Sequence, residues 1–354
     1  MNPNGCKYGQ IKLDFASLHT PRLITNAGIF TNKYQEIDVF RTRTLGRKLF
    51  GPSFDYILFL RPRQWPILTF QLMVGILTAP SVVAAISQGS FESFSWNSLV
   101  MAWIAWVVCL NGGTLAFNSA YDRDENDIAY LVKPPPPPQH LATFSFILMT
   151  IGAVLALLVT PAFGLVTGGC VIMSILYSHN AFRWKSIPGG DLAINMIGYG
   201  GCTTLSGIMV GQVVLGAISV NPDQAGWLII VGFGLLFGSF YPLTQIYQLD
   251  TDRKCGDLTL VAAIGTGKAL TLAIVLGVAA TIFLLGAAWL WNDAFRLLLP
   301  LLAALIIWIV MLVVWYRKSA RMKVAAHENG MYIALTVWAL IDLSVLISRY
   351  GSML

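Results

Sequence analysis

Charged residues are scarce in this chain of 354 residues, because lysine, arginine, aspartate and glutamate together make up only 11% of it. Soluble domains carry about 25% charged residues. Hydrophobic residues reach 56%, and much of this content lies in long uninterrupted runs. The composition therefore excludes an ordinary water-soluble domain and predicts a polytopic membrane protein, in which helices satisfy their own backbone hydrogen bonds.

Cysteine and histidine are also few. The five cysteines are odd in number and show no C-x-x-C spacing, and the four histidines are scattered. Neither a disulfide framework nor a zinc site is indicated. The net charge of +6 comes without an aromatic-basic recognition module, so no nucleic-acid partner is expected. The lipid bilayer is the expected partner of the apolar and basic residues. We also expect no cleavable signal peptide at the start of the sequence.

Apolar runs of roughly 17–25 residues predict an all-α fold with about nine transmembrane helices. The predicted spans are residues 65–87, 97–117, 141–160, 163–178, 191–219, 226–247, 269–290, 295–315 and 331–348. Residues 1–55 are mixed and polar, and are predicted to form a weakly structured N-terminal extension. Residues 56–354 are predicted to form one catalytic transmembrane domain.

The basic residues predict the orientation of these spans. With nine helices, 21 of the 23 lysines and arginines fall on one side of the membrane. The positive-inside rule then places the N-terminus, and the loops after even-numbered spans, in the cytosol. Those loops include both acidic segments described next, so the active site of this multi-pass protein is predicted to be cytosolic.

Two acidic segments follow apolar runs, and together they hold seven of the 17 acidic residues. In the first, residues 118–127, Asn118, Asp122 and Asn126 are spaced at i, i+4 and i+8, which places them on one face of a helix. Asp127 lies on a neighbouring face. Such hard oxygen ligands suit Mg²⁺ bridged to a substrate phosphate. Solvated loop charges would explain one such segment, but two on the same side favour a metal site.

The second segment, residues 250–257, supplies Asp252 and Asp257, and Gly256 permits a turn that brings Asp257 toward a metal. Two opposed carboxylate clusters can hold metal ions that neutralise a departing diphosphate. Basic side chains on the same side are expected to bind the phosphate oxygens. These residues are Arg123, Lys133, Lys185, Arg253 and Lys254.

These residues resemble the motifs of the UbiA superfamily of intramembrane prenyltransferases. That family's first motif is Asn-Asp-x-x-Asp-x-x-x-Asp, and this chain reads Asn118-Ser-x-x-Asp122-x-x-x-Asn126. The second motif is an Asp-x-x-x-Asp element preceded by Tyr-Gln, and the chain reads Tyr247-Gln-Leu-Asp-Thr-Asp252, with Asp257 five residues later. The chain departs from the pattern in two places, since serine follows Asn118 and asparagine occupies the final acidic position. The resemblance covers about residues 55–350.

The resemblance implies a UbiA-like helix bundle with a central cytosol-facing cavity, Mg²⁺ as cofactor, and a geranyl, farnesyl or geranylgeranyl diphosphate as substrate. It implies catalytic roles for Asn118, Asp122, Asp252 and Tyr247. The implied metal ligands are Asn118, Asp122, Asn126, Asp127, Asp252 and Asp257. The segment Arg61-Pro-Arg63, just before the first predicted span, resembles the family's Arg-Pro element and makes Arg63 a further expected contact of the diphosphate. An aromatic-walled prenyl pocket is expected from Trp65, Asn195, Tyr199 and Tyr241, because ring faces stabilise cations.

Three functions remain open at this point. A prenyltransferase would pass the allylic cation to an aromatic or other small-molecule acceptor, and a UbiA-type terpene cyclase would capture it with the prenyl chain's own double bonds. A membrane transporter is the third reading, since acids within membrane proteins often mark ion paths. The acids of this chain gather at one face rather than at the midplane, where coupled transporters place their sites.

Overall fold

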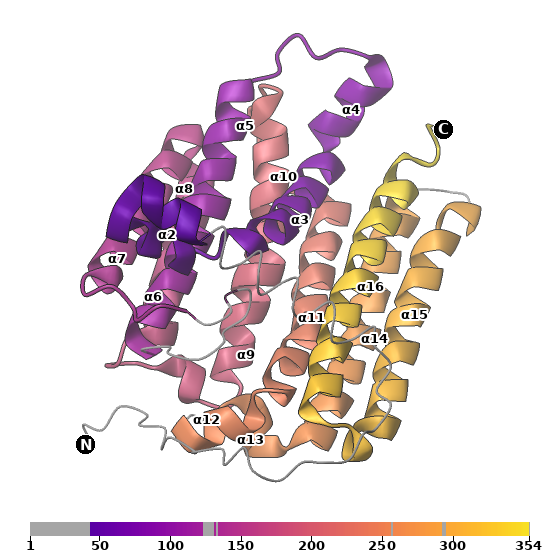
Figure 1. Cartoon of the computed structure of the whole chain (residues 1–354). Coiled ribbons are helices and arrows are strands. Elements are labelled where there is room, and N and C mark those ends of the chain that lie inside the picture. Colours follow the sequence, from indigo (N-terminus) through magenta and orange to yellow (C-terminus); the bar gives the residue numbers. More distant parts are fainter. Residues whose placement is uncertain (1–42, 123–130, 132–133, 256–257, 292–294, 354) are drawn as a thin grey trace, which may run out of the picture.

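The computed structural model describes residues 43–122, 131, 134–255, 258–291 and 295–353. Within these residues the chain is a bundle of long helices (Figure 1). Seven helices are long and apolar enough to cross a membrane, or eight if the bent pair α3–α4 counts as one span. The expected all-α, polytopic membrane fold is confirmed. The predicted number of about nine spans agrees approximately with the seven or eight found among the described residues.

The first predicted span is broken. The chain enters through α2 (Phe54–Phe59) and η2 (Pro62–Gln64), and the span itself consists of α3 (Trp65–Thr78) and α4 (Pro80–Gln88). The two helices are bent by 69° at Ala79. The residue before a proline is disfavoured in the α region, and Ala79 is accordingly extended with ψ 133°. Of the predicted N-terminal extension, residues 43–50 are helical and 1–42 lie outside the described residues.

The second span is a continuous helix of 27 residues, Trp96–Asp122. It consists of α5 (Trp96–Trp103), the π-helical η3 (Ile104–Gly112) and α6 (Gly113–Asp122). The next two spans are α7 (Leu141–Val159) and α8 (Pro161–Ser178). Only Thr160 separates α7 from α8, and the proline that follows it opens α8 at a position where its missing N–H has no cost.

A fifth helical pass runs continuously through α9 (Gly190–Asn195), the π-helical η5 (Met196–Cys202) and α10 (Thr203–Val214). It is absent from the apolar spans above because its glycines and hydroxyl residues dilute the hydropathy. Its glycines pack against α3: a Cβ on Gly207 would lie 2.4 Å from the Leu72 carbonyl oxygen and 2.8 Å from Gly75 Cα. Small residues let membrane helices approach this closely.

The remaining passes are α11 (Gln224–Ile246), α14 (Thr266–Trp291), α15 (Leu299–Lys318) and α16 (Val324–Tyr350), with short helices α12 (Leu249–Cys255) and α13 (Leu260–Ile264) after α11. One apolar core joins α11, α14, α15 and α16, and a second joins α3, the second span, α7, α8 and α10. Gln71 links the halves, because its amide donates to Thr204 Oγ1 (3.1 Å) and accepts from Trp338 Nε1 (3.0 Å).

Candidate functional site

The two sequence motifs lie at the same end of the bundle. α6, which ends at Asp122 of the first motif, finishes in the lower half of Figure 1, and α12, which carries Asp252 of the second motif, lies at the lower end. Four helical passes separate them along the chain: α7, α8, the pass that ends in α10, and α11. An even number of passes returns the chain to the same side, so the fold places Asp122 and Asp252 at the same end of the bundle.

Asp122, at the end of α6, is held by cations from the loop between α8 and α9. Its Oδ1 contacts the ammonium group of the buried Lys185, and the Arg183 guanidinium lies 3.9 Å away. One turn earlier, Asn118 Oδ1 accepts a hydrogen bond from Ser178 Oγ at 3.1 Å. The Lys185 ammonium therefore occupies a position beside Asp122 where a cation is favoured.

A second arginine reaches the first motif from the other side. Arg61 precedes α3, is buried, and donates from its Nη2 to Ser119 Oγ at 2.9 Å. Its backbone is left-handed with φ 51°, and Arg183 shares this conformation with φ 43°. No other non-glycine residue in the described part of the chain has positive φ. Such strained conformations cluster at functional sites, and here both turn a guanidinium group toward α6.

The second motif begins at the C-terminal end of α11. Asp252 in α12 accepts a hydrogen bond from Thr259 Oγ1 at 3.2 Å, while Asp250 and Arg253 are exposed. The Tyr247 hydroxyl accepts from Gln248 Nε2 at 3.2 Å. Thr259 also caps α13 by accepting from Ala262 N. The position of Asp252 is thus tied to the start of α13.

A fully buried carboxylate, Asp191, fixes α13 against the bundle. Its Oδ2 accepts from Gln245 Nε2 at 2.6 Å and from Leu260 N at 2.9 Å, and its Oδ1 accepts from Gly189 N and Leu192 N. Gln245 in turn accepts from Val261 N at 3.2 Å. These contacts join α9, α11 and α13, and they position the segment that follows the second motif.

A cavity of about 200 Å³ lies above the first motif, between α3, the second span, α8 and the pass formed by α9, η5 and α10. Arg61 is the single charged side chain among the described residues that line it. The other lining residues are Leu68, Trp106, Leu110, Asn111, Thr114, Leu115, Asn118, Cys170, Met173, Ser174, Tyr177, Ile194, Asn195, Gly198, Tyr199 and Thr203. The cavity is therefore mostly apolar and aromatic, with polar groups at a few positions.

Two π-helical segments face this cavity. η3 contributes Trp106 and Asn111, and η5 contributes Tyr199. Trp106 Nε1 donates to Thr203 Oγ1 at 3.3 Å, which connects the two passes. π-Helical turns occur frequently at functional sites, and both of these segments present side chains to the same cavity.

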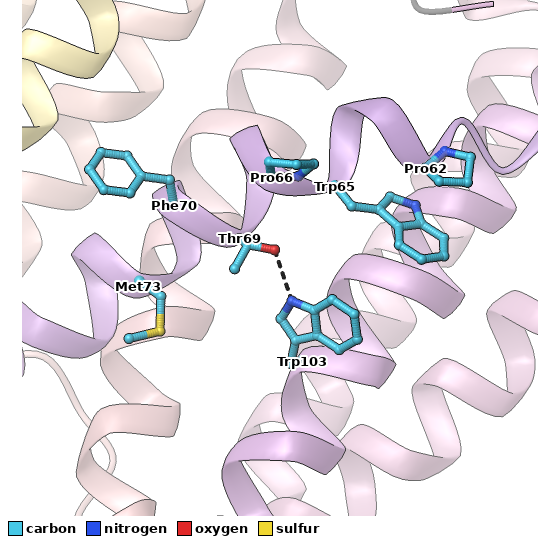
Figure 2. A pocket seen from close by; sticks show the side chains of 7 residues that line it. All are labelled: Pro62, Trp65, Pro66, Thr69, Phe70, Met73 and Trp103. Carbon is cyan, nitrogen blue, oxygen red and sulfur yellow. Dashed lines mark hydrogen bonds between the residues drawn. The ribbon is translucent and has the colours of Figure 1, made fainter. Parts of the chain in front are cut away.

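A separate groove of about 440 Å³ runs along the first turns of α3. Figure 2 shows its lining residues, Pro62, Trp65, Pro66, Thr69, Phe70, Met73 and Trp103. Trp103 donates to Thr69 Oγ1 at 2.8 Å, and the rings of Trp65 and Trp103 meet edge to face with centroids 6.2 Å apart. The groove is mostly apolar, and none of its lining residues belongs to either acidic motif.

The structure separates the four residues of the expected prenyl pocket. Asn195 and Tyr199 line the cavity, and Trp65 lines the groove. The Tyr241 hydroxyl lies 3.0 Å from that of the cavity residue Tyr177. Phe237 stacks on the ring of Tyr199 with centroids 5.4 Å apart, so this aromatic cluster backs the cavity wall formed by η5.

The predicted diphosphate and metal residues are also divided. Lys185 contacts Asp122, whereas Arg63 and Arg253 are exposed and do not line the cavity. The remaining predicted positions lie outside the described residues, or have side chains that do: Arg123, Asn126, Asp127, Lys133, Lys254 and Asp257. Their roles stay predictions.

Sequence reasoning missed Arg61, Arg183, Asp191 and Asn111 as contributors to the site. Arg61 stood beside the chosen Arg63 in the same Arg-Pro-Arg element. The proline between them was a partial signal, because it restricts the backbone of Arg61, the residue before it, and so marks that position as constrained. Asn111 carries no local signal of this kind.

The donor set fits a hard divalent cation. Asn118 lines the cavity and carries an amide oxygen, and Asp122 offers a part-exposed carboxylate that already attracts an ammonium group. Oxygen ligands of this type suit Mg²⁺. Within the described residues no three histidine, cysteine, aspartate or glutamate side chains gather in one place. The aspartates needed to complete such a group, Asp127 and Asp257, lie outside that part of the chain.

Comparison with known proteins identifies relatives of this fold. Residues 77–336 match the UbiA prenyltransferase family. A structure of digeranylgeranylglyceryl phosphate synthase is 16% identical, with a TM-score of 0.61 over 84% of this chain and 98% of that one. A UbiA homologue from Archaeoglobus fulgidus bound to GPP and Mg²⁺ is 17% identical, with a TM-score of 0.55 over 81% of this chain and 99% of that one.

The same homologue bound to DMAPP and Mg²⁺ gives the same identity and TM-score, and covers 82% of this chain. A comparison with curated proteins found no matching sequence. The structural likeness is one of fold, and the family match spans most of the helix bundle described above.

Proposed function

Because this chain belongs to the UbiA prenyltransferase family, we propose that it is a Mg²⁺-dependent enzyme that ionises an allylic prenyl diphosphate and transfers the prenyl cation to an acceptor. The observation that carries the proposal is the arrangement around Asp122. The Asp122 carboxylate contacts the Lys185 ammonium group, and one turn earlier Asn118 lines a cavity with aromatic walls that Arg61 also lines.

In the proposed reaction the bond between the allylic carbon and the diphosphate oxygen breaks, and both electrons leave with the diphosphate. Bound Mg²⁺, held by Asn118 and Asp122 together with Asp252, would supply charge neutralisation to that leaving group. Arg61 binds phosphate oxygens through its planar fork of donors. Lys185 is the second cation within reach, and it exchanges Asp122 for a phosphate oxygen as the site fills.

The cavity residues stabilise the carbocation that remains. Trp106, Tyr177 and Tyr199 offer ring faces, which attract cations, and the enclosed site excludes the water that would quench it. An electron pair of the acceptor then forms the new bond to the allylic carbon, and the acceptor loses a proton.

The test uses the full chain in detergent or in isolated membranes. Geranyl, farnesyl and geranylgeranyl diphosphates are supplied with Mg²⁺ or with EDTA, and both pyrophosphate release and organic products are measured. We expect pyrophosphate release to require Mg²⁺. We expect a stable prenylated product to form only when an acceptor is present. A cyclic hydrocarbon formed without acceptor would replace the transferase with a terpene cyclase, and release of no pyrophosphate under any condition would refute both.

Substitutions at three positions locate the chemistry. Asp122→Ala and Asp252→Ala are each expected to abolish turnover while the protein still inserts and folds, and the corresponding Asp→Asn changes are expected to be severe because the metal needs charge as well as oxygen. Asp223→Asn is the matched control, since Asp223 caps α11 at the other end of that helix from the second motif. Near-normal activity in the Asp122 or Asp252 variants would remove the metal assignment.

A further inference from the structure

Asn111 has a side chain that the fold leaves without partners. The residue is 5% exposed and lines the cavity. Neither its amide nitrogen nor its amide oxygen forms a hydrogen bond within the described part of the chain. A buried polar group in this state costs stability, because it has lost its bonds to water without replacing them. Native structures keep few such groups, and each one calls for a specific explanation.

Three other polar side chains around the cavity have hydrogen-bond partners of their own. The Thr114 and Ser174 hydroxyls lie 2.7 Å apart, and Ser174 also donates to the Cys170 carbonyl. Asn195 Nδ2 donates to the Asp191 carbonyl at 2.8 Å. These groups serve the packing of their own helices. Asn111 stands apart from them because both its donor and its acceptor remain available to a molecule inside the cavity.

The position of Asn111 relates it to the first motif. Asn111 is the next-to-last residue of the π-helical η3, close to the junction with α6. Asn118 lies seven residues further along the same helix. At 1.5 Å per residue this separation is about 10 Å along the helix axis. Both residues line the cavity, so Asn111 lies deeper than the end at which the diphosphate is proposed to bind.

The chemistry of the amide limits which chemical groups of a ligand Asn111 can bind. Arg61, the one charged residue among the described lining residues, contacts Ser119 at the motif end. A carboxylate ligand would bring a buried negative charge that the neutral amide cannot offset, and it has no proton to donate to the amide oxygen. A hydroxyl group can donate to Oδ1 or accept from Nδ2. A purely hydrocarbon group would leave both atoms unpaired.

We propose that Asn111 is a specificity-determining residue that hydrogen-bonds a neutral hydroxyl group of the acceptor and holds the acceptor between its amide and the ionising prenyl chain. The inference rests on the proposed prenyl transfer, because it identifies the class of molecule that captures the cation. It also accounts for an unpaired amide in a membrane bundle, since the amide gains a hydrogen bond when the acceptor is bound.

The first measurement asks whether Asn111 serves the fold. Leucine has nearly the shape of asparagine without its polar atoms, so Asn111→Leu removes an unpaired group rather than a bond. The thermal midpoint of the ligand-free protein in detergent is expected to stay the same or to rise. A clear fall would show that the amide has a structural partner, and it would overturn the proposal.

The second measurement asks what Asn111 binds, with 1-naphthol and naphthalene as probes for isothermal titration calorimetry. The full chain is titrated with each probe, both alone and in the presence of Mg²⁺ and geranyl thiolodiphosphate, an analogue whose diphosphate leaves very slowly. We expect the wild-type chain to bind 1-naphthol about threefold to tenfold more tightly than naphthalene, and Asn111→Leu to bind both equally.

Thr114→Val is the matched control, because it also replaces a polar group of the same cavity wall, but one whose hydroxyl is already paired with Ser174. It is expected to retain the preference for 1-naphthol. If Asn111→Leu keeps that preference, the inference is refuted while the proposed function stands. If the chain fails to bind geranyl thiolodiphosphate with Mg²⁺, the proposed function is refuted, and the titrations without the analogue still decide the role of Asn111.

Discussion

Replacing Asp191 by alanine tests how the second motif is held in place. The carboxylate is completely buried. Its two oxygens accept four hydrogen bonds, from Gly189 N at 3.0 Å, Leu192 N at 2.8 Å, Gln245 Nε2 at 2.6 Å and Leu260 N at 2.9 Å. Two of these bonds cross to α11 and α13, so alanine at this position weakens the attachment of the segment that begins at Thr259, which keeps the bond from Val261 N to Gln245.

The magnitude follows from the groups that alanine leaves behind. A buried donor without a partner costs about 1–3 kcal/mol, and the two donors that come from other elements, Gln245 and Leu260, have no local substitute. Removal of one member of a buried charged network typically costs about 3–5 kcal/mol. We therefore expect Asp191→Ala to destabilise the protein by about 4 kcal/mol, which corresponds to a fall of roughly 5 °C in the thermal midpoint.

The assay combines thermal unfolding in detergent with turnover measured well below the midpoint of the variant. Turnover is expected to fall as well, because Thr259 both opens α13 and donates to Asp252. Asp223→Ala is the control: Asp223 Oδ1 accepts from Gly226 N at 2.7 Å as a helix cap, and its loss is expected to cost about 1 kcal/mol with turnover unchanged. A wild-type midpoint and wild-type turnover in Asp191→Ala would refute this account of α13.

Three further changes probe the site and the bundle. Arg61→Lys keeps the charge but loses the planar fork, so KM for the prenyl diphosphate is expected to rise about tenfold at an unchanged thermal midpoint, and an unchanged KM would contradict the assignment. Lys185→Met removes the ammonium group beside Asp122, so the Mg²⁺ concentration that gives half of the maximal thermal stabilisation is expected to fall, and turnover is expected to fall as well. A higher Mg²⁺ concentration at this half-maximum would contradict the competition between Lys185 and Mg²⁺ for Asp122. Gly207→Ala places a methyl group 2.4 Å from a backbone oxygen and is expected to cost about 1–3 kcal/mol, whereas Gly169→Ala has open space and is expected to leave the midpoint unchanged or slightly higher.

Hydropathy predicted the fold well because length and apolar content are local properties. The predicted span 141–160 differs from α7 by one residue, and 163–178 ends where α8 ends. The errors fall where local chemistry breaks a helix without lowering its hydropathy. The span predicted over 65–87 is bent at the Ala79–Pro80 junction, and the long span over 191–219 ends at Val214.

The site was less predictable because its key contacts join distant parts of the chain. Asp191 meets Gln245 and Leu260, which are 54 and 69 residues away. In the sequence it stands at the start of an apolar run, where a helix-terminal charge is the ordinary explanation. Only the packing of α9 against α11 and α13 turns that carboxylate into a tertiary contact.

The π-helical segments explain why the cavity itself could not be located from periodicity. A helix of 3.6 residues per turn assigns each residue about 100° of rotation, and a π-helical turn takes in an extra residue. Every side chain after such a turn is therefore displaced from the face that a regular helix predicts. The spacing of Asn118 and Asp122 remained readable because both lie within α6, beyond η3. Asn111 lies seven residues before Asn118, a spacing that also suits one face of a regular helix, so the feature that the sequence does not record is the packing around η3 that leaves the Asn111 amide unpaired.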